Sequence, residues 1–308
     1  MLFARRALGL EISVDGARMA LVAGKHDIPE LKAYGVAPFP ADTVRFSLKE
    51  PNVQNPAAFV AAVREMYLRL LTNERRVSVS LPDASGRVVL LDVETRFKSR
   101  DEGIDIIRWK LKKSFPYDIN EAHLDYQVIE ERETGEISLL VSLIARSVVH
   151  QYEELIAEAG LEPNRIDFTT FNLYRLFAKR LELAENSVVV TCYGEVISIL
   201  VFCGGALKFY RAKEMPGGVL DPNRLFRELN SSFLISQEKY PGQASAEAFC
   251  ITSIDDAEAF CAVVAEATSL EPVLLGVDRV VARDNSIATD GKTLRTLTAS
   301  LGAATRNL

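Results

Sequence analysis

The sequence has 308 residues, which exceeds the usual size of a domain built on one hydrophobic core and predicts two domains or lobes. Charged residues make up 25% and hydrophobic residues 48%, a composition typical of a folded globular protein and not of a disordered one. The formal net charge of −6 argues against a broad nucleic-acid-binding surface, so we expect no nucleic-acid partner.

The sequence has no clear features of a membrane span, a signal peptide or a metal site. No apolar run approaches the roughly 18 residues that would predict a membrane span. Two arginines follow a very short apolar stretch at the N-terminus and Glu11 interrupts it, so we expect no signal peptide. The chain has four cysteines, Cys192, Cys203, Cys250 and Cys261. They form no CxxC pair, which favours free thiols over metal ligands.

The chain begins with a predicted β-meander. Apolar residues alternate along 8–14, the period of a half-buried strand, and Asp15-Gly16 follows as a tight-turn signal. Residues 18–22 form the returning strand and 31–37 a third strand. Pro56 then opens a helix whose apolar residues recur at helical spacing.

A similar order of elements returns later. Strands are predicted at 187–192, 196–202 and 206–211, joined by turns at Gly194-Glu195 and Gly204-Gly205, and helical sequence follows from about Pro222. Two meanders, each followed by helix, predict a duplicated unit with two lobes that face each other across a cleft.

An α/β block separates the two meanders. It starts with a strand at 77–81, and Ser99 or Asp101 can cap a helix that runs to about residue 115. A helix at 148–159 ends at Gly160 with the usual stop pattern. After the second meander, helices are predicted at about 255–268 and 291–306, and we expect the last one to dock on the first lobe.

Several collinear stretches resemble one family. The most specific is 107–121, IRWKLKKSFPYDINE, followed by LDYQ at 124–127; 140–146, 154–163, 167–171 and the hairpin at 9–22 continue the likeness. These stretches are similar to the PilM family of actin-like type IV pilus assembly proteins. The resemblance implies a cytoplasmic protein related in fold to FtsA, with ATP between the lobes. It also implies a groove between the first lobe and the inserted subdomain that holds the short N-terminal tail of the inner-membrane protein PilN.

The expected fold is therefore α/β: an actin-like (RNase H-like) two-lobed fold with an inserted α/β subdomain. The first lobe would comprise residues 1–76, completed by 164–185 and the C-terminal helix 291–308. The inserted subdomain would comprise 77–163. The second lobe would comprise 186–290, with a reduced helical subdomain around 216–245.

The resemblance places a nucleotide site at two hairpins. The matching positions are Glu11, Ser13, Asp15, Gly16, Arg18, Gly194, Glu195, Gly217 and Gly218. Where the family has Asp and Gly in these hairpins, this chain has Glu11 and Ser13 in the first, and Thr191 and Tyr193 in the second. A third contact loop, near 252–256, lacks its glycines. Because glycines admit phosphates and carboxylates hold Mg²⁺, we expect no bound cofactor and no ATP hydrolysis.

The helix at 101–115 carries the predicted partner-binding residues. Ile104, Ile107, Leu111 and Phe115 form one apolar stripe, while Ile106 and Trp109 fall on the opposite side, close to Lys113. A helix with two apolar sides is either buried between sheet and lobe or borders a peptide groove, and both interpretations stay open. The candidate groove residues are Ile106, Trp109, Lys113, Phe115 and Tyr117.

We interpret the chain as a cytoplasmic scaffold of type IV pilus assembly, peripheral at the inner membrane through its partner. The partner would be the N-terminal tail of a PilN-like protein, with other platform proteins as further candidates. One alternative is an active ATPase in which Glu11, Asp15 and Glu195 rearrange around Mg-ATP. A second is the cytoplasmic part of a type II secretion platform. A small-molecule kinase is remote because the sequence offers no evident catalytic aspartate.

Overall fold

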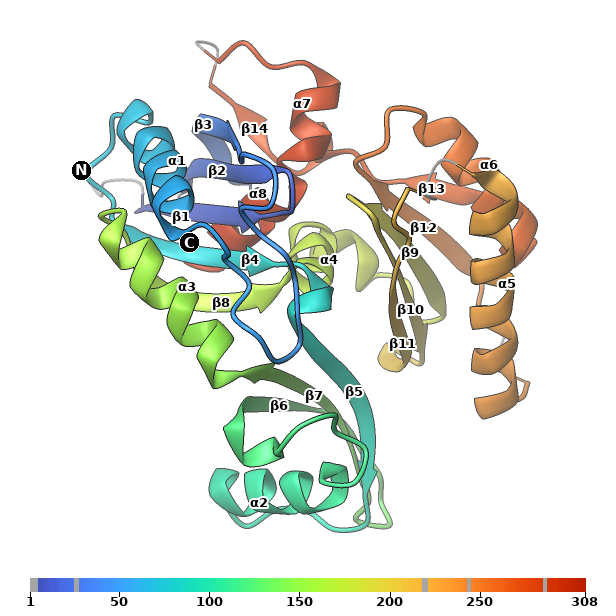
Figure 1. The fold of residues 1–308 in the computed structure, drawn as a ribbon. Helices are drawn as coiled ribbons and strands as arrows, with labels where there is room; N and C mark the ends of the chain where they lie inside the picture. The colour runs from blue at the N-terminus through green and yellow to red at the C-terminus, as the bar shows by residue number, and fades with distance from the viewer. Residues whose placement is uncertain (1–4, 25–27, 218–220, 243–244, 285–286) are drawn as a thin grey trace.

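A computed structural model describes residues 5–24, 28–217, 221–242, 245–284 and 287–308. Within these residues the strands form two large sheets and a smaller one (Figure 1). We call the parts built on them the first lobe, the second lobe and the insert. Figure 1 shows the lobes side by side with helices between them and the insert projecting below. In the described residues, no helix has both the length and the apolarity needed to cross a membrane.

The first-lobe sheet has the strand order β14-β3-β2-β1-β4-β8. Its strands are β1 (Arg5–Ile12), β2 (Gly16–Gly24), β3 (Glu30–Pro38), β4 (Arg76–Leu81), β8 (Glu162–Phe168) and β14 (Ala282–Arg283). One face is covered by α1 (Pro56–Arg69) and α3 (Arg146–Glu158), and the other by α4 (Thr169–Leu181) and α8 (Thr298–Thr305). The sheet is thus buried on both faces.

Strand β1 divides its side chains between these two faces. Leu8, Leu10 and Ile12 join the core under α1 and α3, as the period of two requires. Gly9 and Glu11 therefore face α8 and the second lobe. This alternation places a carboxylate at the end of β1 on the side where the two lobes meet.

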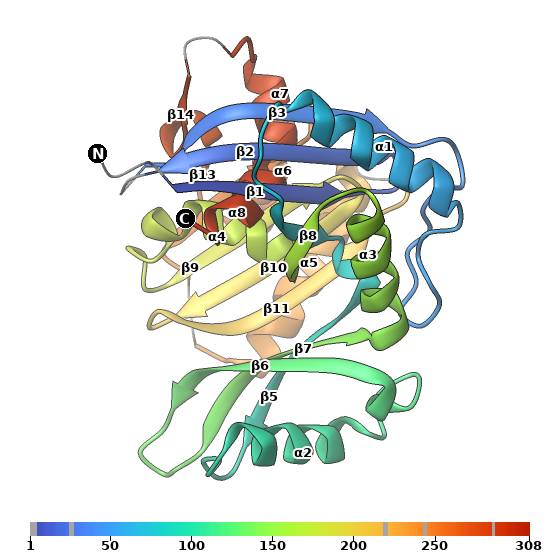
Figure 2. The same cartoon turned by 90° about the vertical axis from the view of Figure 1, so that its left-hand side faces the viewer.

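The second-lobe sheet has the order β11-β10-β9-β12-β13. Its strands are β9 (Ser187–Tyr193), β10 (Val196–Cys203), β11 (Ala206–Glu214), β12 (Glu247–Thr252) and β13 (Pro272–Leu274). Its outer face is covered by α5 (Pro222–Lys239) and α6 (Ala257–Thr268), and its inner face packs toward α4, α8 and the first lobe (Figures 1 and 2). Along β9, Val188 and Val190 face outward, so Val189 and Tyr193 face the first lobe.

The insert sheet has the order β5-β7-β6, with α2 packed on one face. Its elements are β5 (Gly86–Val93), α2 (Arg100–Leu111), β6 (Ala122–Glu131) and β7 (Ile137–Ala145). Short 3-10 helices lie at η1 (Asp83–Ser85), η2 (Ile119–Glu121) and η3 (Val277–Arg279), the last of which precedes β14. Ser99 caps α2 by accepting a hydrogen bond from the Glu102 backbone N–H at 3.2 Å, as the sequence indicated.

Helix α2 ends earlier than the sequence suggested. The expected helix ran to residue 115, but α2 stops at Leu111, with Lys112 as its C-cap. Pro116 disfavours helical geometry at the preceding residue, which is Phe115. Phe115 therefore lies in the connection that follows α2 and is not part of the helical stripe.

Three expected boundaries differ from the observed pairing. Strand β4, which we had grouped with the insert, pairs in parallel with β1 and β8 in the first-lobe sheet, and α3 packs on that sheet. Strand β14 falls in the range expected for the second lobe, yet it pairs with β3. Long-range parallel pairing brings these segments together, and local sequence carries no signal for it.

The C-terminal segment forms two helices where one was expected. Helix α7 (Gly291–Thr296) precedes α8, and their junction lies at Leu297. Every residue from Thr298 to Ala304 is buried, and all but Leu301 are small. A Cβ on Gly9 would lie 1.9 Å from the Ser300 carbonyl oxygen, and a Cβ on Gly302 would lie 1.9 Å from the Asn172 carbonyl oxygen. Both glycines thus permit close backbone contact, of β1 with α8 and of α8 with α4.

This contact predicts the effect of Gly302→Ala. Alanine favours an isolated helix over glycine by about 1 kcal/mol. Overpacking a rigid backbone contact costs about 3 kcal/mol, so the clash should dominate. We expect a clear fall in the urea midpoint and in Tm.

The matched control is Gly291→Ala at the first position of α7. The nearest atom to a Cβ there is 3.9 Å away, so this variant should be as stable as the parent chain. Equal stability of Gly302→Ala and the parent would contradict the close packing of α8.

Candidate functional site

A cavity of about 540 Å³ lies between the two lobes. It is lined by the β1–β2 hairpin, the start of α4, the β9–β10 turn and the end of α7. Its volume falls within the range of small-molecule sites, roughly 300–1,000 Å³. This cavity, which we call the interlobe cavity, contains most of the residues that the sequence assigned to a nucleotide.

The first hairpin holds its charged residues in one connected group. Arg18 Nη1 lies 3.3 Å from Glu11 Oε1 and donates to Ser13 Oγ at 3.0 Å, while its Nη2 donates to Asp15 Oδ2 at 3.2 Å. Ser13 Oγ in turn donates toward Asp15 Oδ1, 2.5 Å away, or the Gly16 carbonyl oxygen, 2.8 Å away. The guanidinium of Arg18 is therefore already shared among groups of its own hairpin.

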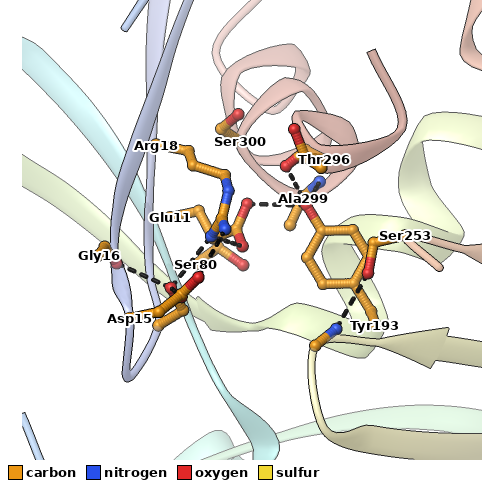
Figure 3. Close-up of polar contacts among 12 residues, drawn as sticks. Glu11, Asp15, Gly16, Arg18, Ser80, Tyr193, Ser253, Thr296, Ala299 and Ser300 are labelled. Atoms are coloured by element: carbon orange, nitrogen blue, oxygen red, sulfur yellow. Dashed lines mark hydrogen bonds and ion pairs between the residues drawn. The ribbon is translucent and has the colours of Figure 1, made fainter. Parts of the chain in front are cut away.

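Tyr193 reaches from the end of β9 across to the first lobe (Figure 3). Its hydroxyl oxygen lies 2.9 Å from Glu11 Oε2 and 2.5 Å from the Thr296 carbonyl oxygen, and it accepts from the Ala299 N–H at 3.4 Å. Tyr193 and Glu11 are only 8% and 2% exposed. One buried phenol thus connects the second lobe, β1 and the α7–α8 junction.

The hydroxyl has two potential acceptors but one proton. Burial raises the pKa of Glu11 to about 7, against the opposing effects of Arg18 and of the Tyr193 hydrogen bond. When Glu11 is protonated, it can donate to Tyr193 Oη while the phenol donates to the Thr296 carbonyl, which satisfies every partner. Burial also raises the pKa of Tyr193 well above its usual value, so the phenol stays protonated.

Two backbone donors at or near the second hairpin are engaged within the protein. The Gly194 N–H donates to Ser253 Oγ at 3.1 Å, and the Gly217 N–H donates to Glu195 Oε1 at 2.8 Å. Gly194 has φ +58°, so it takes the left-handed turn conformation that glycine favours. The N–H groups of these two glycines are thus directed to the protein's own side chains.

Asp83, a partly buried residue in η1, forms part of the cavity wall. Asp83 Oδ2 accepts from both the N–H and the hydroxyl of Thr170, at 3.2 and 2.9 Å, and Oδ1 accepts from Tyr210 at 2.6 Å. Burial raises the pKa of Asp83 above its usual range, although these hydrogen bonds oppose the shift. Both of its oxygens are engaged, and one of them accepts from a backbone N–H in the first turn of α4. The position of Asp83 just after a parallel strand was the one sequence feature that could have indicated its place in the cavity wall.

The predicted nucleotide residues are only partly brought together. Those that line the interlobe cavity are Glu11, Ser13, Asp15, Arg18, Gly194 and Glu195. Gly16 closes the first hairpin beside them, and Gly217 is joined to Glu195. Gly218 lies outside the described residues. In the described part of the chain, no cluster of His, Cys, Asp or Glu has the arrangement of a metal site.

The predicted partner-binding residues fall in different places. Ile106 is half-buried in the insert core, whereas Trp109 is 77% exposed and Lys113 is also exposed. Phe115 and Tyr117 pack edge-to-face with ring centroids 4.7 Å apart. Tyr117 contacts both the insert core and the first-lobe core. The structure thus separates Trp109 from the aromatic pair.

A second cavity of about 470 Å³ lies where the three parts of the fold meet. It is lined by Leu48 from the first lobe, by 86–88 at the start of β5 and by 210–214 of β11. Strands β5 and β11 are edge strands of their sheets and lie beside each other. We call this space the junction cavity.

Comparison with known families assigns the chain. A sequence profile described as type IV pilus assembly protein PilM matches residues 9–222. The chain belongs to the PilM family. The resemblance drawn from the sequence is therefore confirmed. Among curated proteins, no sequence matches this chain.

Solved structures share the fold of this PilM family member. A PilM–PilN type IV pilus biogenesis complex matches with a TM-score of 0.80 and 19% identity, covering 98% of each chain. The cytoplasmic domain of EpsL, an inner-membrane component of the type II secretion system of Vibrio cholerae, has a TM-score of 0.53 and 12% identity over 96% and 94% of the chains.

A Bacteroides thetaiotaomicron protein with an actin-like ATPase fold has a TM-score of 0.51 and 13% identity over 96% of each chain. The expected actin-like two-lobed fold is confirmed by these likenesses.

The buried carboxyl predicts a pH dependence of stability. A folded-state pKa of about 7 for Glu11, against an ordinary value of 4.5, means that the folded state binds the proton more tightly. Glu11 therefore contributes to the free energy of unfolding. The contribution is fully present below pH 4.5 and is lost as the pH rises toward 7, by about 3 kcal/mol in total. Urea unfolding at several pH values measures it.

The matched variant is Glu11→Gln, which imitates the protonated carboxyl. Its unfolding free energy should fall less between pH 5 and 7 than that of the parent chain. Parallel pH profiles for the two proteins would contradict the raised pKa of Glu11.

Proposed function

We propose that this PilM family member is a scaffold of type IV pilus assembly that captures the cytoplasmic N-terminal segment of a PilN-like inner-membrane protein. The family match favours pilus assembly over type II secretion. The likeness to a chain solved in a PilM–PilN complex supports the choice of partner. Such a partner would hold the protein at the cytoplasmic face of the inner membrane.

The junction cavity is the observation that carries the proposal. Two edge strands, β5 and β11, line it with backbone that has a free hydrogen-bonding side. An extended segment can add to such an edge through main-chain hydrogen bonds, while side chains enter adjacent pockets. Leu48 and Val88 supply apolar lining, and Arg87 supplies a cation at the border.

Tyr117 does not line this cavity itself, but it lies near Arg87, which does. Burial, followed by the nearby charge of Glu121, raises the pKa of Tyr117 to about 12, while Arg87 has the opposite effect. Tyr117 is therefore half-buried, uncharged and near Arg87, which lines the cavity. Aromatic and arginine side chains in such positions dominate the binding energy of small interfaces.

Tyr117→Ala should weaken binding of the PilN-like segment by roughly tenfold or more, since truncating an aromatic anchor commonly costs about 2 kcal/mol. Fluorescence anisotropy measures this with a labelled peptide that corresponds to the N-terminal cytoplasmic segment of a PilN-like protein.

Trp109→Ala is the matched control because Trp109 is exposed and lies apart from the junction cavity. It should leave the peptide affinity unchanged. Failure of the parent chain to bind the peptide would overturn the proposed capture. Binding that Tyr117→Ala does not weaken would instead remove Tyr117 from the site.

We further propose that the interlobe cavity does not hold Mg-ATP and that the protein does not hydrolyse it. Among the described residues that line the cavity, the carboxylates of Asp15, Glu195 and Glu214 are exposed, and Arg18 is the one basic side chain. A highly anionic triphosphate would meet these carboxylates while Arg18 is already paired. Tyr193 also occupies the place where the second hairpin would approach a phosphate.

Millimolar Mg-ATP should therefore leave the Tm of the parent chain unchanged. A ligand that binds only the folded state raises stability by RT ln(1 + [L]/Kd), about 2.7 kcal/mol at a hundredfold excess over Kd. Differential scanning fluorimetry with ATP, and with magnesium chloride alone as the control, measures the shift. A saturable rise in Tm specific to ATP would favour the alternative of an active ATPase.

A further inference from the structure

The proposed peptide site does not explain why Trp109 is exposed. It is the only tryptophan of the chain and is 77% exposed, although large aromatic side chains are usually well buried. It lies on α2, which forms the far end of the insert, remote from both large sheets (Figures 1 and 2). Among the described residues, none from α2 lines the interlobe cavity or the junction cavity.

Apart from Arg100, which forms an ion pair with Asp125, the charges of α2 are divided along its length. Asp101, Glu102 and Asp105 lie in its first half, where negative charge complements the helix dipole. The last turn and the residues just after it carry cations and Trp109. The end of α2 is therefore basic and aromatic on a chain whose formal net charge is −6.

The cations beside Trp109 are available for an external partner. Lys112 and Lys113 are exposed, and neither side chain makes a hydrogen bond or an ion pair in the part of the chain that the structure describes. Lys110, by contrast, donates to the Asp92 carbonyl oxygen at 3.3 Å and is held against β5. Lys112 and Lys113 have ordinary lysine side chains that can extend past the helix end.

We propose that this end of α2, formed by Trp109, Lys112 and Lys113, contacts an anionic membrane surface directly. An indole ring suits the boundary between acyl chains and headgroups because it is apolar with one N–H donor. Lysines beside it are attracted by the negative potential of anionic lipids. Helix α2 lies at the far end of the insert, which can approach a planar surface, whereas an extended peptide needs a groove or a free strand edge.

This contact goes beyond the proposed peptide capture, which ties the protein to the membrane only through its partner. A patch with so few cations gives weak attachment by itself. Its effect is to orient the insert toward the bilayer once the partner has brought the chain there, since two weak attachments act together.

The single tryptophan reports the contact without a label. Emission of the full chain should shift to the blue when vesicles containing phosphatidylglycerol are added, because the indole leaves water. Pure phosphatidylcholine vesicles should cause no shift. Raising the salt should abolish the shift, since the Debye length falls from about 10 Å at 0.1 M to about 3 Å at 1 M.

Lys112→Glu/Lys113→Glu should lose the shift, whereas the matched reversal Lys49→Glu/Arg227→Glu should retain it; both of these control residues are exposed and lie outside α2. Trp109→Ala should reduce the fraction of protein that floats with anionic vesicles. Thermal melts confirm that each variant is folded.

No shift with anionic vesicles, or an equal shift with neutral ones, would overturn the proposal. An emission shift that appears only when an acidic protein is added would indicate that this end of α2 binds that protein and not a membrane. These measurements contain no PilN-like peptide, so their failure leaves the proposed capture intact, and failure of peptide binding leaves the membrane contact intact.

Discussion

The close packing of α8 between the two lobes is the constraint on which the rest of this structure depends. Side chains from β1, β2, α4, β9, β12 and α8 form one continuous core, so the lobes do not have separate interiors where they meet. Backbone contact at Gly9 and Gly302 removes the space that side chains would otherwise need. A rigid α8 fixes the end of β1 relative to the end of β9, and this places Glu11 and Tyr193 against each other.

In the interlobe cavity, charged groups and backbone donors of the hairpins are engaged in contacts within the protein. Phosphate-binding hairpins require free backbone donors and uncommitted positive charge. In this chain Arg18 is shared with Glu11 and Asp15, and the Gly217 N–H is directed to Glu195. Each contact is ordinary by itself, but together they leave these groups paired within the protein.

The two cavities share part of their walls. Asp83, Val196 and Glu214 line both, and Asp83 joins α4 to β11 through Thr170 and Tyr210. The insert is further held to the second lobe by the ion pair of Lys208 with Glu130, 2.6 Å apart. The position of the insert therefore depends on polar contacts with the second lobe as well as on its covalent links to the first.

The sequence alone determined the local elements and the family, because alternation, helical spacing and turn residues act over a few neighbours. It indicated the hairpin at Asp15–Gly16, the Ser99 cap and the altered positions Glu11 and Tyr193. It could not assign β4 to the first lobe, because its pairing with β1 joins residues far apart in the chain. Only the tertiary structure decided that Tyr193 reaches Glu11 across the wall of the interlobe cavity and that Trp109 and Tyr117 lie apart, since burial depends on what packs against each side chain from distant segments.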